Sequence, residues 1–249
     1  MRDFEDILGA DGLLARHLPG FAPRREQLDM ARCVGDALEA LQPLVVEAGT
    51  GTGKTFAYLV PALLSGRHLI ISTGTKTLQD QLFHRDLPAV AGALGRPVKI
   101  ALLKGRANYL CHHRLQLAAG TPELGFGGSS LQRIESWALK TRAGDISEVA
   151  DVMEGDPVWG AVTSNRENCL GAECAHFSNC HVMAARRAAQ AADIVVVNHH
   201  LLLADLALKE EGFGDLLPGA QAVILDEAHQ VPEIAAQFFG ASLGGRRIT

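Results

Sequence analysis

The segment LVVEAGTGTGKTFAYLVPALLSG, residues 44–66, decides the fold. Its apolar start predicts a short buried strand over 44–49, and its end predicts a helix over 54–66. A glycine-rich turn between a strand and a helix leaves backbone N–H groups free at the helix N-terminus, where they bind phosphate. The segment therefore predicts a nucleotide-binding site on an α/β fold.

The loop EAGTGTGKT, residues 47–55, matches the phosphate-binding pattern A/G-x-x-x-x-G-K-T, with alanine where the commonest form has glycine. The pattern predicts that Lys54 meets the β and γ oxygens of ATP and that Thr55 binds Mg²⁺. An ordinary glycine turn is the alternative, and the strand–loop–helix context disfavours it. The residues expected to bind the nucleotide are Ala48, Gly49, Thr50, Gly51, Thr52, Gly53, Lys54 and Thr55.

Strands and helices alternate on both sides of this loop. The pattern before it predicts a helix between Pro23 and Pro43, with one apolar face formed by Met30, Val34, Leu38 and Leu41. Strands are predicted at 68–73, 98–105, 193–198 and 222–229, and further helices at 76–91 and 199–210. Such alternation predicts a parallel sheet with helices on both faces.

The strand AVILDEAH, residues 222–229, supplies the second half of the predicted site. Its apolar residues end at Asp226, which places this carboxylate at the carboxyl edge of a parallel sheet, where such folds bind ligands. We expect Asp226 to hold Mg²⁺ and Glu227 to orient and deprotonate the attacking water.

The alternation breaks down over residues 106–181, which we interpret as an inserted module. Residues 99–142 hold seven basic and two acidic residues, whereas 143–160 hold five acidic residues and no lysine or arginine. The basic stretch is compatible with phosphate contacts and equally with a solvated face.

Four of the five cysteines lie in this module, and they suggest one four-ligand metal site. Cys169, Cys174 and Cys180 follow the pattern C-x₄-C-x₅-C, and Cys111 lies upstream. Zinc and an iron–sulfur cluster both accept four thiolates, and the loose spacing favours [4Fe–4S]. We interpret Cys33 as a small buried hydrophobe. The histidines beside the cysteines are interpreted as polar surface or DNA-side residues rather than ligands: His112, His113, His176 and His181.

Together these motifs resemble a known family. AGTGTGKT combined with DEAH resembles the DEAH class of superfamily 2 helicases. A cysteine-bearing insert that opens with KGRANYLC, followed by DIVVVNHHLLLADL (193–206), resembles the iron–sulfur DNA helicases of the XPD and DinG type, and most of all the bacterial DinG/YoaA branch.

The resemblance implies a RecA-like domain interrupted by an iron–sulfur insert. It divides the chain into residues 1–105, the first part of helicase domain 1; residues 106–181, the insert; and residues 182–249, the remainder with the DEAH motif. The family also needs a second RecA-like domain, which these residues lack. We therefore expect a fragment that binds nucleotide weakly and hydrolyses it slowly or not at all.

The resemblance also implies a function and residue roles. The family separates DNA strands and moves 5′ to 3′ on one strand, so single-stranded DNA, duplex junctions and a place in DNA repair are expected. Gln27 is then the adenine-contacting glutamine, with an exposed helix residue as the alternative, and His229 couples nucleotide state to the nucleic-acid site. Candidates for contacts with the DNA strand are Thr73, Thr75, Arg106, Tyr109 and Arg114. For Tyr109, packing inside the insert is an equally weighted alternative.

Composition limits the alternatives. The 249 residues are 47% hydrophobic with a formal net charge of −5, which is typical of a globular protein. The sequence lacks a run of 18 apolar residues and does not begin like a secretory signal, so we expect a cytoplasmic protein and no membrane. Two other hypotheses stay open: a P-loop ATPase with a structural zinc module, and a non-enzymatic nucleic-acid-binding fragment.

Overall fold

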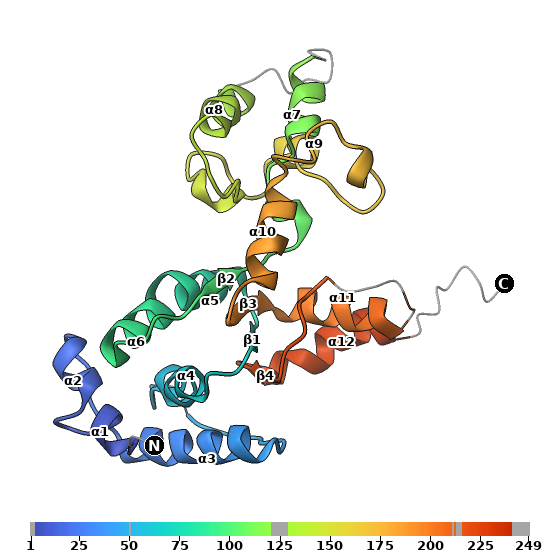
Figure 1. Ribbon diagram of the computed structural model, residues 1–249. Coiled ribbons are helices and arrows are strands. Elements are labelled where there is room, and N and C mark those ends of the chain that lie inside the picture. Colours follow the sequence, from blue (N-terminus) through green and yellow to red (C-terminus); the bar gives the residue numbers. More distant parts are fainter. Residues whose placement is uncertain (1–2, 50, 121–128, 211, 213–215, 241–249) are drawn as a thin grey trace. The chain divides into compact units, whose positions relative to one another are not determined.

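The structure is a computed structural model that describes residues 3–49, 51–120, 129–210, 212 and 216–240 (Figure 1). The chain forms two compact units. Unit 1 comprises Met1–Leu102 and Ala189–Thr249, and unit 2 comprises Leu103–Ala188. No helix in the described part of the chain is long and apolar enough to span a membrane.

Unit 1 contains a four-stranded parallel sheet with the strand order β2-β3-β1-β4. The strands are β1 (Leu69–Thr73), β2 (Ile100–Leu102), β3 (Ile194–Asn198) and β4 (Ala222–Leu225). In the register, Leu69 pairs with Ile194 on one side and with Ala222 on the other. The central position of β1 explains its complete burial, since both of its edges and both of its faces are covered. The predicted parallel α/β fold is confirmed, and it fits a RecA-like helicase domain.

The helices of unit 1 are α1 (Glu5–Leu8), α2 (Leu13–His17), α3 (Arg25–Ala40), α4 (Lys54–Ser65), α5 (Lys76–Gln81), α6 (Leu87–Leu94), α11 (His199–Glu210) and α12 (Val231–Phe239). Most of those that precede β2 contribute to one hydrophobic core, whereas within the described residues α5, α11 and α12 do not. A π-helical turn, η1 (Leu82–Asp86), joins α5 to α6, so the helix predicted over 76–91 is one longer, irregular helical segment.

Helix α3 confirms the predicted helix and most of its predicted apolar face. Val34 and Leu38 are buried and Met30 packs against the core, whereas Leu41 is 61% exposed and lies beyond the helix in a left-handed conformation. Leu41 is the part of the face that was predicted wrongly, because the helix ends at Ala40 before its side chain can join the stripe. Gln27 and Ala31 extend the buried stripe towards the start of the helix.

The strand predicted over 44–49 is wrong. Residues 43–49 adopt no regular secondary structure, and Val45 is 96% exposed. A β-strand is stabilised by hydrogen bonds to a neighbouring strand, and within the described residues the sheet of unit 1 ends at β4 and β2 without pairing to this segment. An apolar run in the sequence therefore does not guarantee a neighbouring strand with which it can form hydrogen bonds.

Unit 2 is mostly irregular, as the sequence predicts. Its helices are α7 (His112–Ala119), α8 (Ser129–Ala138), α9 (Val158–Val162) and the first residues of α10 (His181–Gln190), with 3-10 turns η2 (Arg106–Asn108), η4 (Ile146–Glu148) and η5 (Gly171–Glu173). Its separate core includes Leu110, Ile134 and Val162. Isolated bridges join Tyr109 to Asp145 and Leu110 to Thr163, and thereby connect the beginning of the unit to its middle.

A buried ion pair reinforces that connection. The Lys104 ammonium lies 2.7 Å from the Asp145 carboxylate, with the two side chains 1% and 11% exposed. The Lys104 backbone N–H donates to the Tyr109 hydroxyl at 3.0 Å. Tyr109 is 3% exposed. Of the two interpretations of Tyr109, packing inside the insert is therefore confirmed, because a buried ring is not available to stack on a base.

Candidate functional site

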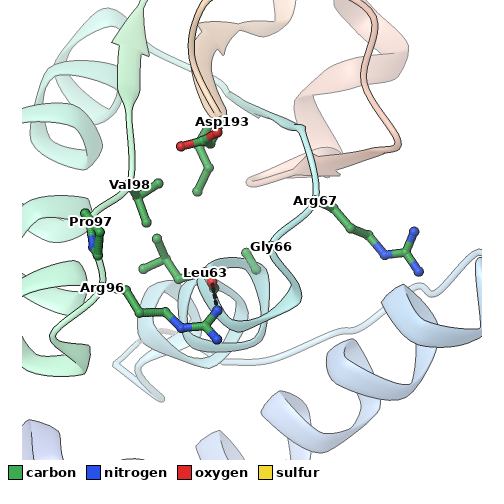
Figure 2. A pocket seen from close by; sticks show the side chains of 9 residues that line it. Leu63, Gly66, Arg67, Arg96, Pro97, Val98 and Asp193 are labelled. Atoms are coloured by element: carbon green, nitrogen blue, oxygen red, sulfur yellow. Dashed lines mark hydrogen bonds between the residues drawn. The ribbon is translucent and has the colours of Figure 1, made fainter.

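A pocket in unit 1 lies at the amino ends of the parallel strands. It is lined by residues that precede β1 and β3, including Gly66, Arg67 and Asp193. Figure 2 shows the Arg96 guanidinium turned towards the Leu63 carbonyl, to which it donates at 3.1 Å. Ligands of open parallel sheets bind at the opposite, carboxyl ends of the strands. The candidate site is therefore at that other edge.

The phosphate-binding loop ends at the first turn of α4. Gly51 and Gly53 have φ angles of +79° and +82°, which side-chain-bearing residues rarely adopt, and Lys54 and Thr55 begin the helix directly afterwards. The Thr52 hydroxyl donates to the Gly49 carbonyl at 2.9 Å. Ala48 and Gly49 belong to the irregular segment before the loop, and Thr50 lies outside the described residues. The loop has the local geometry of an anion-binding helix start.

Helix α3 supports this loop from outside. The Gln27 amide nitrogen donates to the Gly53 carbonyl at 3.0 Å, and Arg24 donates to the Gly51 carbonyl. Gln27 is 3% exposed, so its alternative interpretation as an exposed helix residue is wrong. Its Oε1 atom is buried and has no hydrogen-bond partner among the described residues. A buried amide oxygen without a partner costs free energy unless a ligand satisfies it.

The DEAH residues meet the loop at the carboxyl edge of the sheet. The Lys54 ammonium lies 3.4 Å from the Glu227 carboxylate, and His229 Nδ1 lies 3.4 Å from the other Glu227 oxygen. The Thr73 hydroxyl donates to Asp226 Oδ2 at 3.5 Å. Residues from the ends of β1 and β4 and the start of α4 are thus brought together across more than 150 positions of sequence.

Two acidic groups at this edge have an environment that favours a cation. Burial raises the pKa of Asp226, and the negative charge of Glu227 raises it further, while Tyr58 and Lys54 oppose the shift. Burial also raises the pKa of Tyr58 well above its usual value, and Asp226 adds to that increase. Neighbouring carboxylates of this kind are the oxygen ligands that Mg²⁺ prefers, because the cation offsets both burial and repulsion.

Tyr58 and His199 are two residues of this region that the motifs did not reveal. Tyr58 follows Lys54 by four positions, so the helical repeat places both on one side of α4. This spacing could have predicted from the sequence that Tyr58 lies near the site. His199 is fully buried and contacts Ser72 and Asp226. Burial lowers its pKa, whereas its hydrogen bonds to the Asp226 and Glu227 backbone act in the opposite direction. No spacing rule connects the first residue of α11 with residues at the ends of β1 and β4.

The cysteines of unit 2 are only partly gathered. Burial raises the pKa of the Cys111 thiol, and Cys174 and Cys180 raise it further, so these three thiols lie within electrostatic reach of one another. Arg186 has a pKa lowered by burial, and the neighbouring Cys169 and Cys180 counteract that shift. The described residues nevertheless contain no group of three or more His, Cys, Asp or Glu side chains placed to hold a metal ion. Four thiols are a donor set suited to iron or zinc.

Three histidines stack beside these thiols. The ring of His112 lies 4.8 Å from that of His181 and 5.9 Å from that of His176. Burial lowers the pKa of His112 and of His181. His181 is 8% exposed, so its interpretation as a surface residue is wrong. Cys33 is exposed, which corrects its interpretation as a buried hydrophobe.

Comparisons with known proteins agree with these motifs. The DEAD_2 family profile matches residues 165–248. The chain is 51% identical to an ATP-dependent DNA helicase YoaA of Haemophilus influenzae over 245 residues, and 52% identical to that of Escherichia coli over 246; each match covers 98% of this chain. An ATP-dependent helicase DinG of Mycobacterium tuberculosis is 38% identical over 261 residues, with 92% of this chain covered.

The chain spans 38% of the length of each of these YoaA relatives and 39% of the DinG relative. The resemblance inferred from the motifs is confirmed: along nearly all of its length, this chain corresponds to the N-terminal region of the DinG/YoaA-type helicases.

Proposed function

We propose that this chain is the N-terminal part of an ATP-dependent DNA helicase that moves 5′ to 3′ on single-stranded DNA and carries a [4Fe–4S] cluster. The observation that carries the proposal is the meeting of Lys54 with Glu227, and of Thr73 with Asp226, at the carboxyl edge of a parallel sheet. Relatives named ATP-dependent DNA helicases support the same activity. In domain terms, residues 106–181 form the cluster insert within a RecA-like domain built from 1–105 and 182–249.

Each residue then has a role in ATP hydrolysis. The loop from Ala48 to Thr55 cradles the phosphates through its N–H groups, and Lys54 exchanges Glu227 for the γ-phosphate. Glu227, freed from that ion pair, accepts a proton from the attacking water. Thr55 and Asp226 would hold a Mg²⁺ ion, which would neutralise phosphate charge. The exposed His229 side chain contacts Glu227. Through this contact it couples the presence of the nucleotide to the DNA-binding site.

The donor set of unit 2 fits an iron–sulfur cluster by its chemistry. Cys111, Cys169, Cys174 and Cys180 would hold it, and the cluster would brace an otherwise irregular segment. Basic residues of the unit, the half-buried Arg106 among them, then contact the DNA strand or the duplex junction. We propose that the helicase acts in DNA repair in the cytoplasm.

The first experiment separates nucleotide binding from hydrolysis in the full-length helicase. We expect Lys54→Ala and Glu227→Gln each to lower DNA-stimulated kcat about 100-fold or more, because each removes a group that acts on the γ-phosphate or the water. Glu227→Gln should still bind ATP within about fivefold of wild type, since the neutral amide does not repel phosphate. Glu39→Gln, which changes an exposed glutamate of α3 that has no role in the proposed site, is the matched control.

The results distinguish the competing functions. A wild-type protein without DNA-stimulated ATPase activity contradicts the proposal, and strand binding unaffected by nucleotide favours the non-enzymatic alternative. Partial duplexes with a 5′ or a 3′ single-stranded tail test direction, and preferential unwinding from a 3′ tail contradicts the stated polarity.

The second experiment identifies the metal in anoxically purified protein. We expect iron and acid-labile sulfide, with a brown colour and broad absorbance near ~400 nm, because iron–thiolate centres absorb visible light. Cys174→Ser should lose most of both elements, whereas Cys33→Ser, which changes the exposed cysteine of unit 1, should keep them. A colourless protein that contains zinc supports the zinc-module alternative.

A further inference from the structure

The segment NHH, residues 198–200, is placed at the nucleotide edge of the sheet but has no role in the proposed chemistry. Asn198 ends β3, and its side chain caps α11 by accepting from the Leu201 N–H at 2.8 Å. His200 is exposed. His199, between them, has 0% of its surface exposed and forms hydrogen bonds to two other strands.

These hydrogen bonds close a ring through three strand ends. His199 Nδ1 lies 2.7 Å from the Ser72 hydroxyl, and His199 Nε2 lies 2.9 Å from the Asp226 carbonyl oxygen. The Asp226 backbone N–H donates to the Ser72 carbonyl at 2.8 Å. Both polar groups of the Asp226 backbone are therefore held, one by β1 directly and one through the imidazole.

The chemistry of the partners fixes the tautomer of the ring. A carbonyl oxygen only accepts, so Nε2 must carry a proton and donate to Asp226. In a neutral imidazole Nδ1 is then an acceptor, and the Ser72 hydroxyl donates to it. Burial in the core favours this neutral form. Both nitrogens are thereby satisfied, which gives the ring one orientation.

The carbonyl that His199 holds belongs to the peptide between the two acidic residues of the site. Glu227, on the other side of that peptide, adopts a left-handed conformation with φ +55° and ψ +42°. A non-glycine residue keeps this conformation only where its surroundings impose it. The hydrogen bond from His199 is one such constraint, and it sets the direction in which Glu227 leaves the strand.

The other end of the ring leads to the segment proposed to contact DNA. Ser72 is followed by Thr73, whose hydroxyl reaches Asp226, and by Gly74. The Gln230 side chain lies so close to Gly74 that a Cβ atom there would overlap it. Residues 72–74 at the end of β1 are thus in contact with the DEAH turn at three successive positions. His199 adds a further connection, because it forms hydrogen bonds to both segments.

We propose that His199 is a positioning residue that locks the Asp226–Glu227 peptide to the end of β1, so that the two acids and the Thr73–Thr75 segment move as one body. This inference rests on the proposed function, because it assigns a role in coupling DNA contact to ATP hydrolysis. A histidine that only fills the core would affect stability without acting selectively on the hydrolytic step.

The test uses the full-length protein and variants that each keep a different hydrogen bond. His199→Gln retains an N–H group near the position of Nε2 and so keeps the bond to Asp226. His199→Asn is too short to reach Asp226 but keeps an acceptor near Ser72. Ser72→Ala removes the hydroxyl alone. His200→Gln, the exposed neighbour at the start of the same helix, is the matched control.

We expect His199→Asn to lower DNA-stimulated kcat about 30- to 100-fold, since a displaced acid is no longer aligned with the water. The KM for ATP should stay within about threefold, because the phosphate loop is untouched. His199→Gln should recover about tenfold of that loss, and Ser72→Ala should lower kcat about three- to tenfold. Combining Ser72→Ala with His199→Asn should add little, since both act through one ring.

Several outcomes overturn the inference. These are a folded His199→Asn protein with wild-type kcat, an equal loss in His199→Gln and His199→Asn, and strictly additive effects in the double variant. Thermal unfolding of each variant identifies a loss caused by misfolding, and Ser72→Ala decides the question if the histidine variants do not fold. If the wild type itself shows no DNA stimulation, the proposed function fails and this inference falls with it; retained stimulation in every variant contradicts the inference alone.

Discussion

The nucleotide edge of unit 1 and the cysteine region of unit 2 differ in how their functional side chains come together. At the nucleotide edge, hydrogen bonds and ion pairs already join α3, α4, β1 and β4 through Gln27, Lys54, Thr73 and Glu227. In unit 2, Cys174 and Cys180 contribute to the raised pKa of Cys111, yet the described residues form no group arranged to hold a metal.

The difference follows from the elements that carry the two sets of residues. Parallel strands point in one direction, so their ends converge and deliver side chains to one edge without help from a ligand. Three of the cysteines lie on irregular segments, and Cys111 stands just before α7. Segments without regular hydrogen bonding have many accessible conformations, and a bound metal is the usual means of selecting one. We therefore expect unit 1 to be preformed and unit 2 to depend on its metal.

Removal of the proposed metal of unit 2 should produce the largest effect. Metal binding contributes on the order of 10 kcal/mol to the folding of small metal-held units. We therefore expect chelation, or Cys174→Ser, to expose residues 103–188 to proteolysis while nucleotide binding by unit 1 stays within about threefold. Limited proteolysis followed by mass mapping measures the first effect, and nucleotide titration measures the second.

Cys33→Ser is the control for that comparison, because its thiol is exposed in unit 1. Equal protease resistance of residues 103–188 with and without metal would show that unit 2 is preformed as well, and the contrast between the two units would disappear.

Breaking the buried ion pair of unit 2 should have the next largest effect. Lys104→Met leaves the Asp145 carboxylate in the interior without its cation, a change that costs about 3–5 kcal/mol. The loss should appear as local unfolding of residues 103–188 in hydrogen exchange, and the exposed Lys140→Met should lack it. Adding Asp145→Leu to Lys104→Met should restore part of the stability, since no buried charge remains. A Lys104→Met protein as stable as wild type would show that the metal alone holds unit 2.

The sequence predicted the nucleotide edge far better than the details of the sheet. Glycines before Lys54 and an apolar strand before Asp226 are local signals with one structural solution, and both residues lie where those signals place them. The strand over 44–49 failed because pairing is a property of two segments, and composition describes only one. Its exposed Val45 shows that apolar character does not by itself secure burial.

Long-range contacts were the other part that the sequence did not predict. His199 bonds to residues that are 127 and 27 positions away, and Lys104 pairs with a residue 41 positions away in an irregular segment. Neither contact follows a helical or strand period, so no pattern reveals it. The sequence left two interpretations of Tyr109 open for the same reason, because its hydroxyl, which accepts from the Lys104 N–H, lies in the interior that this ion pair helps to form.

Substitution of the two glycines that flank α4 tests whether the phosphate-binding loop of unit 1 is preformed. Gly53 and Gly66 both have positive φ, so alanine at either position costs about 1–2 kcal/mol of folding free energy. A Cβ on Gly53 would also overlap the Gln27 amide, whereas nothing lies within 4 Å of a Cβ on Gly66. We expect Gly53→Ala to weaken ATP binding about tenfold, and Gly66→Ala to leave it unchanged. Equal ATP affinities of the Gly53→Ala and Gly66→Ala proteins would show that the loop changes conformation on nucleotide binding and is not preformed.

The smallest effect should come from Gln27, and it distinguishes support of the loop from recognition of the base. Gln27→Ala removes the hydrogen bond to the Gly53 carbonyl and should weaken nucleotide binding by about 0.5–1.5 kcal/mol, or roughly two- to twelvefold. If the amide only supports the loop, ATP and GTP lose equal affinity. If the buried Oε1 atom, which has no partner among the described residues, accepts from adenine, ATP loses more than GTP. Titrations with both nucleotides, and with Glu26→Ala as the exposed neighbouring control, measure the difference. Equal losses for the two nucleotides would remove the adenine-contacting role and leave Gln27 as part of the preformed edge.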